Sequence, residues 1–575
     1  MNRPNPAIVA QAAVRRLPRA ALALFCLAYV LPGFIDRAPW RSDDITAFGY
    51  MVALAGGATS WMSPQIMGIV PEVDALLPYW LGAWAIQLAP SWMDSDFAAR
   101  VPFIGLLIVT LIGTWYGTYQ LARSPQAQPL PFAFGGEALP TDYARAVADG
   151  ALLALIACLG LAQPAHETTP ILAQLGFSAL AFYGFAAFPN RHSVPLFATA
   201  VGLGGLVLSG APTLATLLGL GGSLTLLLDT GEGPAEARSA ARLQAATMAA
   251  LTLLAAFLAS TLQLWHWRIA LPPAAGQTWL GIGNLLVWFT WPAWPLALWT
   301  LWRWRRHLVR HLSRPSRHLV LPLWFVLVTL GTTVATASPE RTLLLALPAL
   351  AAMAAFALPT LERPVAALID WFTLLFFSGC ALIIWLVWVA MQTGVPWQPA
   401  ANVERLAPGF VPSFSGVPFL IALAASGAWL WLVHWRAGRH RTAIWKSMVL
   451  PAGGAALCWL LLMTLWLPLL DYARSYVPLV NRTLLTMRPL QTGDCAYNFG
   501  LTVGQITALE FHGALMIKPV GDAARCRWLI VNQDVVRQSP ATMDLSSWTL
   551  ASQLSHPTDS NDNLLIYQLQ SRAKP

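Results

Sequence analysis

Hydrophobic residues are grouped along this chain in long segments that short polar stretches separate. A helix of about 18 or more apolar residues is long enough to cross the hydrocarbon core of a bilayer. Such segments lie near 20–35, 98–121, 146–164, 170–188, 194–211, 213–228, 243–264, 281–301, 319–337, 342–360, 366–390, 417–434 and 447–470. The pattern predicts an all-α polytopic membrane protein with about 13 transmembrane helices.

The charges between these segments predict the orientation of the chain. An odd number of spans places the two termini on opposite sides of the membrane. The loops 303–318 and 434–446 are strongly basic, as cytoplasmic loops are, whereas acids gather in the alternate loops, beginning with 36–97. We therefore expect the N-terminus, with an uncleaved first helix at 20–35, in the cytoplasm, and the C-terminal region outside it.

Two polar regions interrupt the apolar pattern. The first outer loop, 36–97, holds two short helical patterns at 44–56 and 76–89, which we expect to lie along the outer membrane face. The tail 471–575 contains short alternating runs such as "RWLIVNQDV", which predict strands. The expected organisation is a membrane domain over 1–470 followed by a small α/β extracytoplasmic domain.

The cysteines suggest one covalent link. Four of the six lie in apolar segments, whereas Cys495 and Cys526 lie in the polar tail. An extracytoplasmic tail would allow these two to form a disulfide; two unrelated free thiols are the alternative.

Composition narrows the choice of partners. The chain is 57% hydrophobic and 11% charged, whereas soluble domains are about 25% charged. Its 28 Trp suit the two interfacial belts of a membrane protein. The basic loops account for the net charge of +9, and no nucleic-acid-binding motif is present. Membrane lipids, and not nucleic acid, are the expected partners.

The stretch "RSDDITAFGYM" places two adjacent acids, Asp43 and Asp44, directly after the first span. One interpretation is structural, because "SDD" is a favourable N-terminus for a following helix. The other is chemical: a carboxylate at the membrane surface can act as a base or bind a metal ion. The residues alone leave both interpretations open.

An ordered series of motifs continues from this acidic pair. It consists of "LPYWLGAWAIQL" (77–88), "DFAARVPFIGLL" (96–107), "GLGGLVLSGAPTL" (202–214), "WFTWPAWPLAL" (288–298) and "SPERTLLLALPALAAM" (338–353). Over roughly 36–360 the series resembles bacterial membrane glycosyltransferases of the protein mannosyltransferase superfamily, above all the aminoarabinose transferases of lipid A. The resemblance implies the C-type glycosyltransferase (GT-C) fold.

The resemblance also implies a reaction. In this family a sugar moves from a polyprenyl-phosphate donor to a periplasmic acceptor, which here would be lipid A, a glycan or a protein, at the outer face of the inner membrane. The acid after the first span is central, so Asp43 is the expected catalytic residue and Asp44 its neighbour and metal partner. A divalent ion (Mg²⁺, Mn²⁺ or Zn²⁺) against the leaving phosphate is the expected cofactor.

Further candidates lie in the outer loops, each with a structural alternative. His166 and Glu167 form a second acidic or metal site, or an ordinary polar turn. His266 and Arg268 lie among aromatic residues and suit a sugar phosphate, or anchor the chain at the interface. Arg341 is the expected phosphate ligand, or a helix anchor. Arg100 contacts the donor phosphate or fixes the first loop.

The chain also departs from these relatives. Asp74 and Ser209 stand where the aminoarabinose transferases carry lysines. Glu72 and Asp74 are therefore candidates to join Asp43 in a metal site. The missing lysines also leave open a catalytically inactive relative, and a transporter, a flippase or a polysaccharide ligase or polymerase is a further alternative. Clean spans with acids confined to the outer loops favour surface chemistry over transport.

Overall fold

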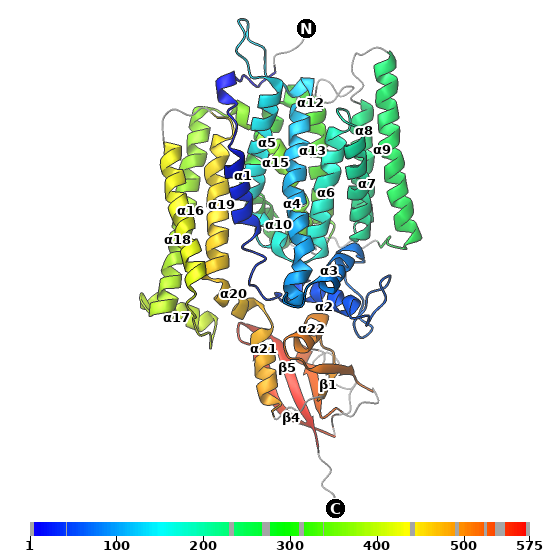
Figure 1. Cartoon of the computed structure of the whole chain (residues 1–575), viewed down its shortest axis with the longest axis vertical. Coiled ribbons are helices and arrows are strands. Elements are labelled where there is room, and N and C mark those ends of the chain that lie inside the picture. The colour runs from blue at the N-terminus through cyan, green and yellow to red at the C-terminus, as the bar shows by residue number, and fades with distance from the viewer. Residues whose placement is uncertain are drawn as a thin grey trace, which may run out of the picture.

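A computed structural model describes residues 5–41, 43–228, 235–266, 276–309, 316–336, 339–437, 443–488, 494–521, 526–534, 545 and 547–570. It consists of a helical bundle with a small domain at one end, and the first outer loop lies between the two (Figure 1).

The bundle is formed by helices that run roughly side by side (Figure 1). They are α1 (Arg19–Val30), α4 (Ser95–Ala122), α5 (Pro140–Ala157), α6 (Pro170–Ala187), α7 (Ser193–Leu208), α8 (Pro212–Leu228), α9 (Ala235–Thr261), α10 (Gly276–Phe289), α11 (Ala293–Arg303), α12 (Arg305–Val309), α13 (Arg317–Val334), α14 (Pro339–Leu344), α15 (Leu347–Ala355), α16 (Arg363–Thr393), α18 (Gly416–Ala437) and α19 (Lys446–Leu465).

The predicted multi-pass membrane architecture is confirmed. Among the described residues, eight helices are long and apolar enough to cross a membrane, and α5 with the segment Leu159–His166 forms a further, bent pair. Each predicted apolar segment overlaps a helix, but α1, α7, α8 and the apolar part of α10 are shorter than a full span. The count of 13 transmembrane helices remains a prediction.

Two predicted spans are broken. The segment 146–164 bends by 65° after α5, and 281–301 is divided where α10 ends at Phe289 and α11 begins at Ala293. Pro292 lies in the second break and has no N–H to continue a helical ladder. Hydrophobicity alone does not reveal such breaks, because both halves are equally apolar.

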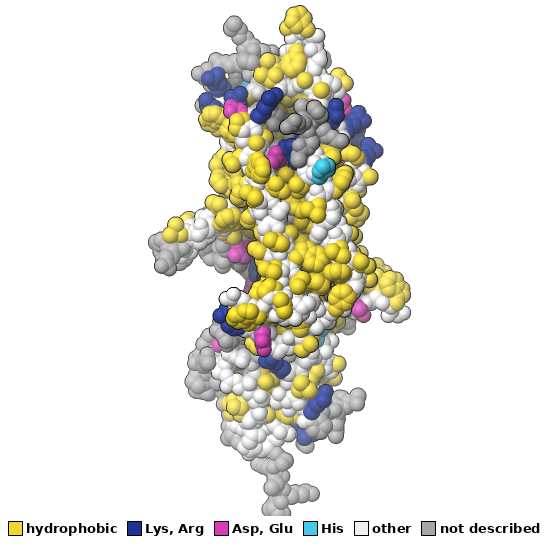
Figure 2. Space-filling view, turned by 90° about the vertical axis from the view of Figure 1, so that its left-hand side faces the viewer, with side chains coloured by type: hydrophobic (Ala, Val, Ile, Leu, Met, Phe, Trp, Pro, Cys, Tyr) yellow, Lys and Arg dark blue, Asp and Glu magenta, His cyan; other side chains and the backbone are white. Residues whose placement is uncertain are grey.

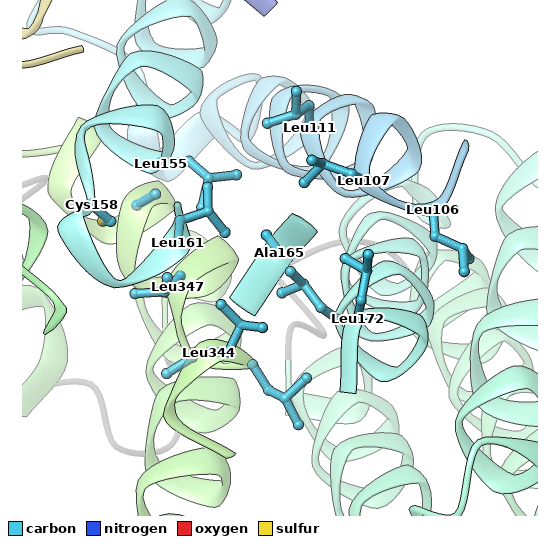
Figure 3. Packing of buried hydrophobic residues seen from close by; sticks show 14 of the residues in the cluster. Leu106, Leu107, Leu111, Leu155, Cys158, Leu161, Ala165, Leu172, Leu344 and Leu347 are labelled. Carbon is cyan, nitrogen blue, oxygen red and sulfur yellow. The ribbon is translucent and has the colours of Figure 1, made fainter. Parts of the chain in front are cut away.

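The core of the bundle lies around α15. In the most apolar window of Glu340–Thr360, the segment that contains α15, 89% of the residues are buried. The corresponding shares are 22% in α16 and 11% in α18, so these two helices face the lipid. Figure 3 shows Leu107 and Leu111 of α4 near Leu155, with Leu172 and Leu347 across the same space. The space-filling view shows the resulting hydrophobic outer surface, with Lys and Arg gathered towards one end (Figure 2).

The first outer loop forms the two predicted helices, α2 (Asp43–Ala55) and α3 (Leu77–Leu88). Three further helices, α17 (Trp397–Leu406), α20 (Leu467–Arg474) and α21 (Val477–Thr486), lie at the same end of the bundle (Figure 1). Helix α20 crosses the expected domain boundary at 470, so the chain enters the C-terminal domain without a linker.

The C-terminal domain is the predicted small α/β unit. Its strands are β1 (Cys495–Phe499), β2 (Met516–Pro519), β3 (Trp528–Asn532), β4 (Trp548–His556) and β5 (Asp559–Leu569), with α22 (Val503–Phe511) after β1. The sheet order is β2-β1-β3-β5-β4, and β1 runs parallel to β2 and β3, while β5 is antiparallel to β3 and β4. A disulfide joins Cys495 at the start of β1 to Cys526 just before β3, with a Cα–Cα distance of 5.0 Å.

Close packing of α2 against α22 fixes the C-terminal domain on the first outer loop. A Cβ atom at Gly49 would lie 2.1 Å from Oγ1 of Thr507, so only glycine permits this approach. Phe48 and Phe511 add an edge-to-face contact with ring centroids 4.8 Å apart. The middle of α2 is thereby packed against α22 of the C-terminal domain.

Candidate active site

A cavity of about 770 Å³ lies where the bundle, the first outer loop and the C-terminal domain meet. Its charged lining residues are Arg41, Asp43, Glu72, Glu167, Arg341, Arg474, Asp559 and Asp562. These eight come from segments that are far apart in the sequence. The fold therefore concentrates charge of both signs at the end of the membrane domain, where a headgroup and a water-soluble molecule can meet.

Asp43 is the first residue of α2 and faces this cavity. Its carboxylate forms an ion pair with the guanidinium of Arg341 from α14. The side chains are 29% and 35% exposed, so both remain accessible to a ligand. The positive end of the helix dipole also favours a carboxylate at this position. The structure thus brings together the two residues that the sequence put forward as base and phosphate ligand.

Asp44 lies outside the cavity lining and is 1% exposed. Arg37 donates to its Oδ2 at 2.8 Å, and Thr168 donates to Oδ1 through both its backbone N–H and its hydroxyl. Burial would raise the pKa of Asp44, but Arg37, Arg100 and the Thr168 hydrogen bonds together hold it below the ordinary value. The expected role of Asp44 beside the reacting atoms is therefore corrected: this carboxylate fixes the loop that carries Asp43.

Glu167 faces the cavity directly after the short helical turn Pro164–His166. Gln163 donates to its Oε1 at 3.0 Å. Burial, with a smaller contribution from the negative charge of Asp44, raises the pKa of Glu167 to about 7. A carboxyl group with this pKa can both accept and donate a proton near neutral pH.

His166 does not join Glu167 in the cavity, which corrects the expected His–Glu metal site. The ring is buried, with Nδ1 facing the carbonyl of Ala162 and Nε2 lying 3.0 Å from the carbonyl of Tyr29. Both nitrogens are therefore occupied by backbone oxygens. His166 therefore belongs to a polar turn, which was the structural alternative for this stretch of sequence.

Arg100 is also buried outside the cavity, with 2% exposure. It forms an ion pair with Asp96 at 3.0 Å and donates to the carbonyl of Phe34. These contacts support the interpretation that Arg100 fixes the first loop, and Arg100 is not among the residues that line the cavity.

The remaining candidates differ in whether they line the cavity. Glu72 lines the cavity, but Asp74 does not; its carboxylate lies 3.1 Å from Nδ1 of His266, which is largely exposed. Arg268 lies outside the described residues. The loop 71–75 therefore contributes one carboxylate to the cavity and one contact to the chain that follows α9.

The cavity carboxylates were also expected to bind a divalent metal ion. Among the described residues, no group of three or more His, Cys, Asp and Glu side chains is placed to hold a metal ion. The cationic partner of Asp43 is instead a guanidinium. A divalent ion that is shared between one or two of these carboxylates and a bound phosphate stays a prediction.

Several cavity residues were missed by sequence reasoning. Arg474 lines the cavity from the end of α20, and Arg41 lines it while forming ion pairs with Asp559 at 3.2 Å and Asp562 at 3.7 Å. A composition change at 471 marked this region only as a domain boundary. No local pattern indicates that a C-terminal turn closes over the first outer loop, since the contact depends on how the two domains dock.

Comparison with known proteins agrees with this architecture. No protein-family model and no curated protein sequence matches the chain. Two crystal structures of ArnT from Cupriavidus metallidurans share its fold, each over 97% of this chain. The apo form has a TM-score of 0.59 and 14% sequence identity, and the match covers 99% of its own chain. The form bound to undecaprenyl phosphate has a TM-score of 0.60 and 13% identity, and the match covers 100% of its chain. At this identity the likeness establishes the fold alone, which is the GT-C fold that the motifs implied.

Proposed function

We propose that this protein is a glycosyltransferase that moves a sugar from a polyprenyl-phosphate donor to an acceptor in the cell envelope. The observation that carries the proposal is the Asp43–Arg341 pair, which faces an accessible cavity at the end of the membrane bundle. A fold shared with ArnT, including a form bound to undecaprenyl phosphate, supports the same class of donor. We place the cavity and the C-terminal domain on the periplasmic side of a bacterial inner membrane.

The donor phosphate is the natural ligand for the cavity cations. Arg341 and Arg474 both line the cavity, and guanidinium groups bind phosphate oxygens in a bidentate fashion. A phosphate that binds Arg341 competes with Asp43 for the same guanidinium. Donor binding therefore releases the Asp43 carboxylate at the moment when a base is needed.

The reaction is a substitution at the anomeric carbon. The acceptor oxygen forms a bond to this carbon while the bond from carbon to the phosphate oxygen breaks, and the lipid phosphate leaves with the bonding electrons. The acceptor proton passes to Asp43. Base assistance of this kind contributes about 10²–10⁴-fold to a rate. Arginines that hold the leaving phosphate stabilise the charge that develops on it.

Glu167 gives the cavity a second group for proton handling. With a pKa of about 7, a substantial fraction of this carboxyl group is protonated at neutral pH. In that form it can donate a hydrogen bond to a sugar or acceptor oxygen.

A transfer assay tests this proposal. Purified protein in nanodiscs receives labelled polyprenyl-phosphate sugars and an envelope extract, and wild type is compared with Asp43→Asn and Asp94→Asn. Asp94 is an exposed acid of the same loop that does not line the cavity, so it is the matched control.

We expect transfer by wild type and Asp94→Asn, and a loss of about 10²–10⁴-fold in Asp43→Asn. Full transfer by Asp43→Asn would remove Asp43 from the reaction and direct attention to Glu167. Absence of transfer from every donor by folded wild-type protein would contradict the enzymatic proposal and favour an inactive relative or a transporter.

A further inference from the structure

A second charged pocket lies at the opposite end of the bundle from the cavity. Its volume is about 310 Å³, and it is formed where α16 and α19 begin and α18 ends. Val9, Leu361 and Ile444 supply apolar walls. Nothing in the proposed transfer reaction uses this pocket, because the residues that line the candidate active-site cavity belong to other segments of the chain, at the other end of the bundle.

The side chains of this pocket carry an excess of positive charge. Arg363, Arg436 and Lys446 line it, and the acid paired with them is Asp370, which binds Arg436 through two nitrogens. Lys446 is buried, with 7% exposure, and lies close enough to Asp370 to affect it electrostatically. The three lining cations thus outnumber the one carboxylate paired with them, and neither Asp370 nor Glu362, which is next to Arg363 in sequence, is itself part of the lining.

Arg363 is the cation best placed to bind a ligand. It is exposed, and among the described residues it forms no ion pair. It is also the first residue of α16, and Lys446 is the first residue of α19, so two helix N-termini add partial positive charge at the same place. A singly charged anion beside Arg363 would lower the net charge of Arg363, Arg436, Lys446 and Asp370 from +2 to +1.

We propose that this pocket binds the phosphodiester of an anionic glycerophospholipid. The pocket opens beside α16 and α18, the helices whose surfaces are most exposed to lipid, so acyl chains can lie along them while the headgroup meets Arg363. Basic pockets between membrane helices recognise anionic headgroups in this way. A zwitterionic lipid fits less well, because its ammonium group would enter a region that is already positive.

Lipid binding to the intact protein tests the proposal. Full-length protein in detergent is titrated with phosphatidylglycerol or phosphatidylcholine, and bound lipid is counted by native mass spectrometry. The variants are Arg363→Gln and the control Arg123→Gln. Arg123 is likewise exposed at this end of the bundle, follows α4, and does not line the pocket.

We expect phosphatidylglycerol to bind wild type and Arg123→Gln equally, and Arg363→Gln about fivefold more weakly, which corresponds to about 1 kcal/mol per basic residue. Phosphatidylcholine should show no difference among the three proteins. Equal phosphatidylglycerol affinity in Arg363→Gln and Arg123→Gln, or equal affinity of wild type for both lipids, would overturn the proposal.

Two further measurements complete the test. Arg363→Gln changes an exposed side chain and should unfold at the wild-type temperature without added lipid, so weaker binding cannot be attributed to misfolding. Inorganic phosphate at millimolar concentration should leave bound phosphatidylglycerol in place, because it lacks acyl chains. Displacement by phosphate would show that the pocket is a general anion site and would contradict a lipid site.

Discussion

Two charged regions at the same end of the bundle differ in how their charges are satisfied. Around Asp44, Arg37 and Thr168 supply hydrogen bonds at close range, and no charge there reaches solvent. In the adjacent cavity, Asp43 and Arg341 are each about one-third exposed. Both regions therefore contain an acid paired with an arginine, but only the second leaves room for a ligand.

Trp40 separates the two regions. Its indole lies 4.5 Å from the guanidinium carbon of Arg37 on the buried side and 5.2 Å from that of Arg474 on the cavity side. Its N–H donates to Asp471 at 2.7 Å. Burial raises the pKa of Asp471 to about 6.

Successive residues of α2 point about 100° apart. The neighbouring acids Asp43 and Asp44 therefore lie on opposite sides of Trp40, one in the cavity and one in the buried region.

The largest expected difference between the two regions is in how much the loss of their acids lowers the free energy of unfolding. Asp44→Asn leaves the buried Arg37 without its carboxylate, and breaking a buried ion pair costs about 3–5 kcal/mol. Asp43→Asn removes a partly exposed pair, which contributes at most about 1 kcal/mol. Denaturant or thermal unfolding in detergent measures both. Similar losses in the two variants would mean that the two regions are not distinct.

A second contrast concerns the cavity cations. Arg341→Gln should lower transfer by about 10²–10³-fold, as the loss of one preorganised donor to a developing oxyanion does. Folding should be nearly unchanged, because its pair with Asp43 is partly exposed. Transfer kinetics with a single labelled donor provide the measurement. Arg474→Gln tests the second cation, and the proposed phosphate site would be wrong if both variants retained full activity.

The pH dependence of stability sharpens the comparison further. Because the pKa of Glu167 is raised from 4.5 to about 7, the folded protein binds more protons than the unfolded chain between these values. Its contribution to stability is therefore present at low pH and is lost as the pH rises through about 7.

Glu167→Gln cannot ionise, so it should be more stable than wild type by about 1–3 kcal/mol at pH 8 and similar to it at pH 4. Unfolding of wild type and Glu167→Gln at both pH values tests this. The assignment of Glu167 would fail if the difference between variant and wild type were the same at the two pH values.

The sequence predicted the elements more successfully than their relations. Apolar runs located the bundle helices, and the patterns at 44–56 and 76–89 located α2 and α3 within one residue. The Asp43–Arg341 pair was anticipated only as two separate candidates. The other differences come from the direction of side chains. Asp44, His166 and Arg100 lie in the predicted segments but point into the protein. Hydrophobic patterning does not specify which polar residue of a loop is buried.

Contacts between domains were beyond sequence reasoning for a related reason. Arg474 and Arg41 become cavity residues only because β5 and α20 come together beside the first outer loop. Such contacts depend on the shapes of the two packed surfaces and on glycines such as Gly49. The need for glycine at this position becomes visible only when α22 is placed against α2. A tail of changed composition gives no sign of this docking.

The smallest expected effect concerns the link between the C-terminal domain and the first outer loop. Arg41 joins Asp559 and Asp562, and these partly exposed pairs contribute about 1 kcal/mol at most. Arg41→Gln should therefore increase hydrogen exchange in the turn between β4 and β5 by about fivefold, while α4 and α6 keep wild-type protection. Arg123→Gln, at the far end of the bundle, should change neither region. Unchanged exchange in Arg41→Gln would mean that other contacts, such as the packing of α2 on α22, hold the domain without these ion pairs.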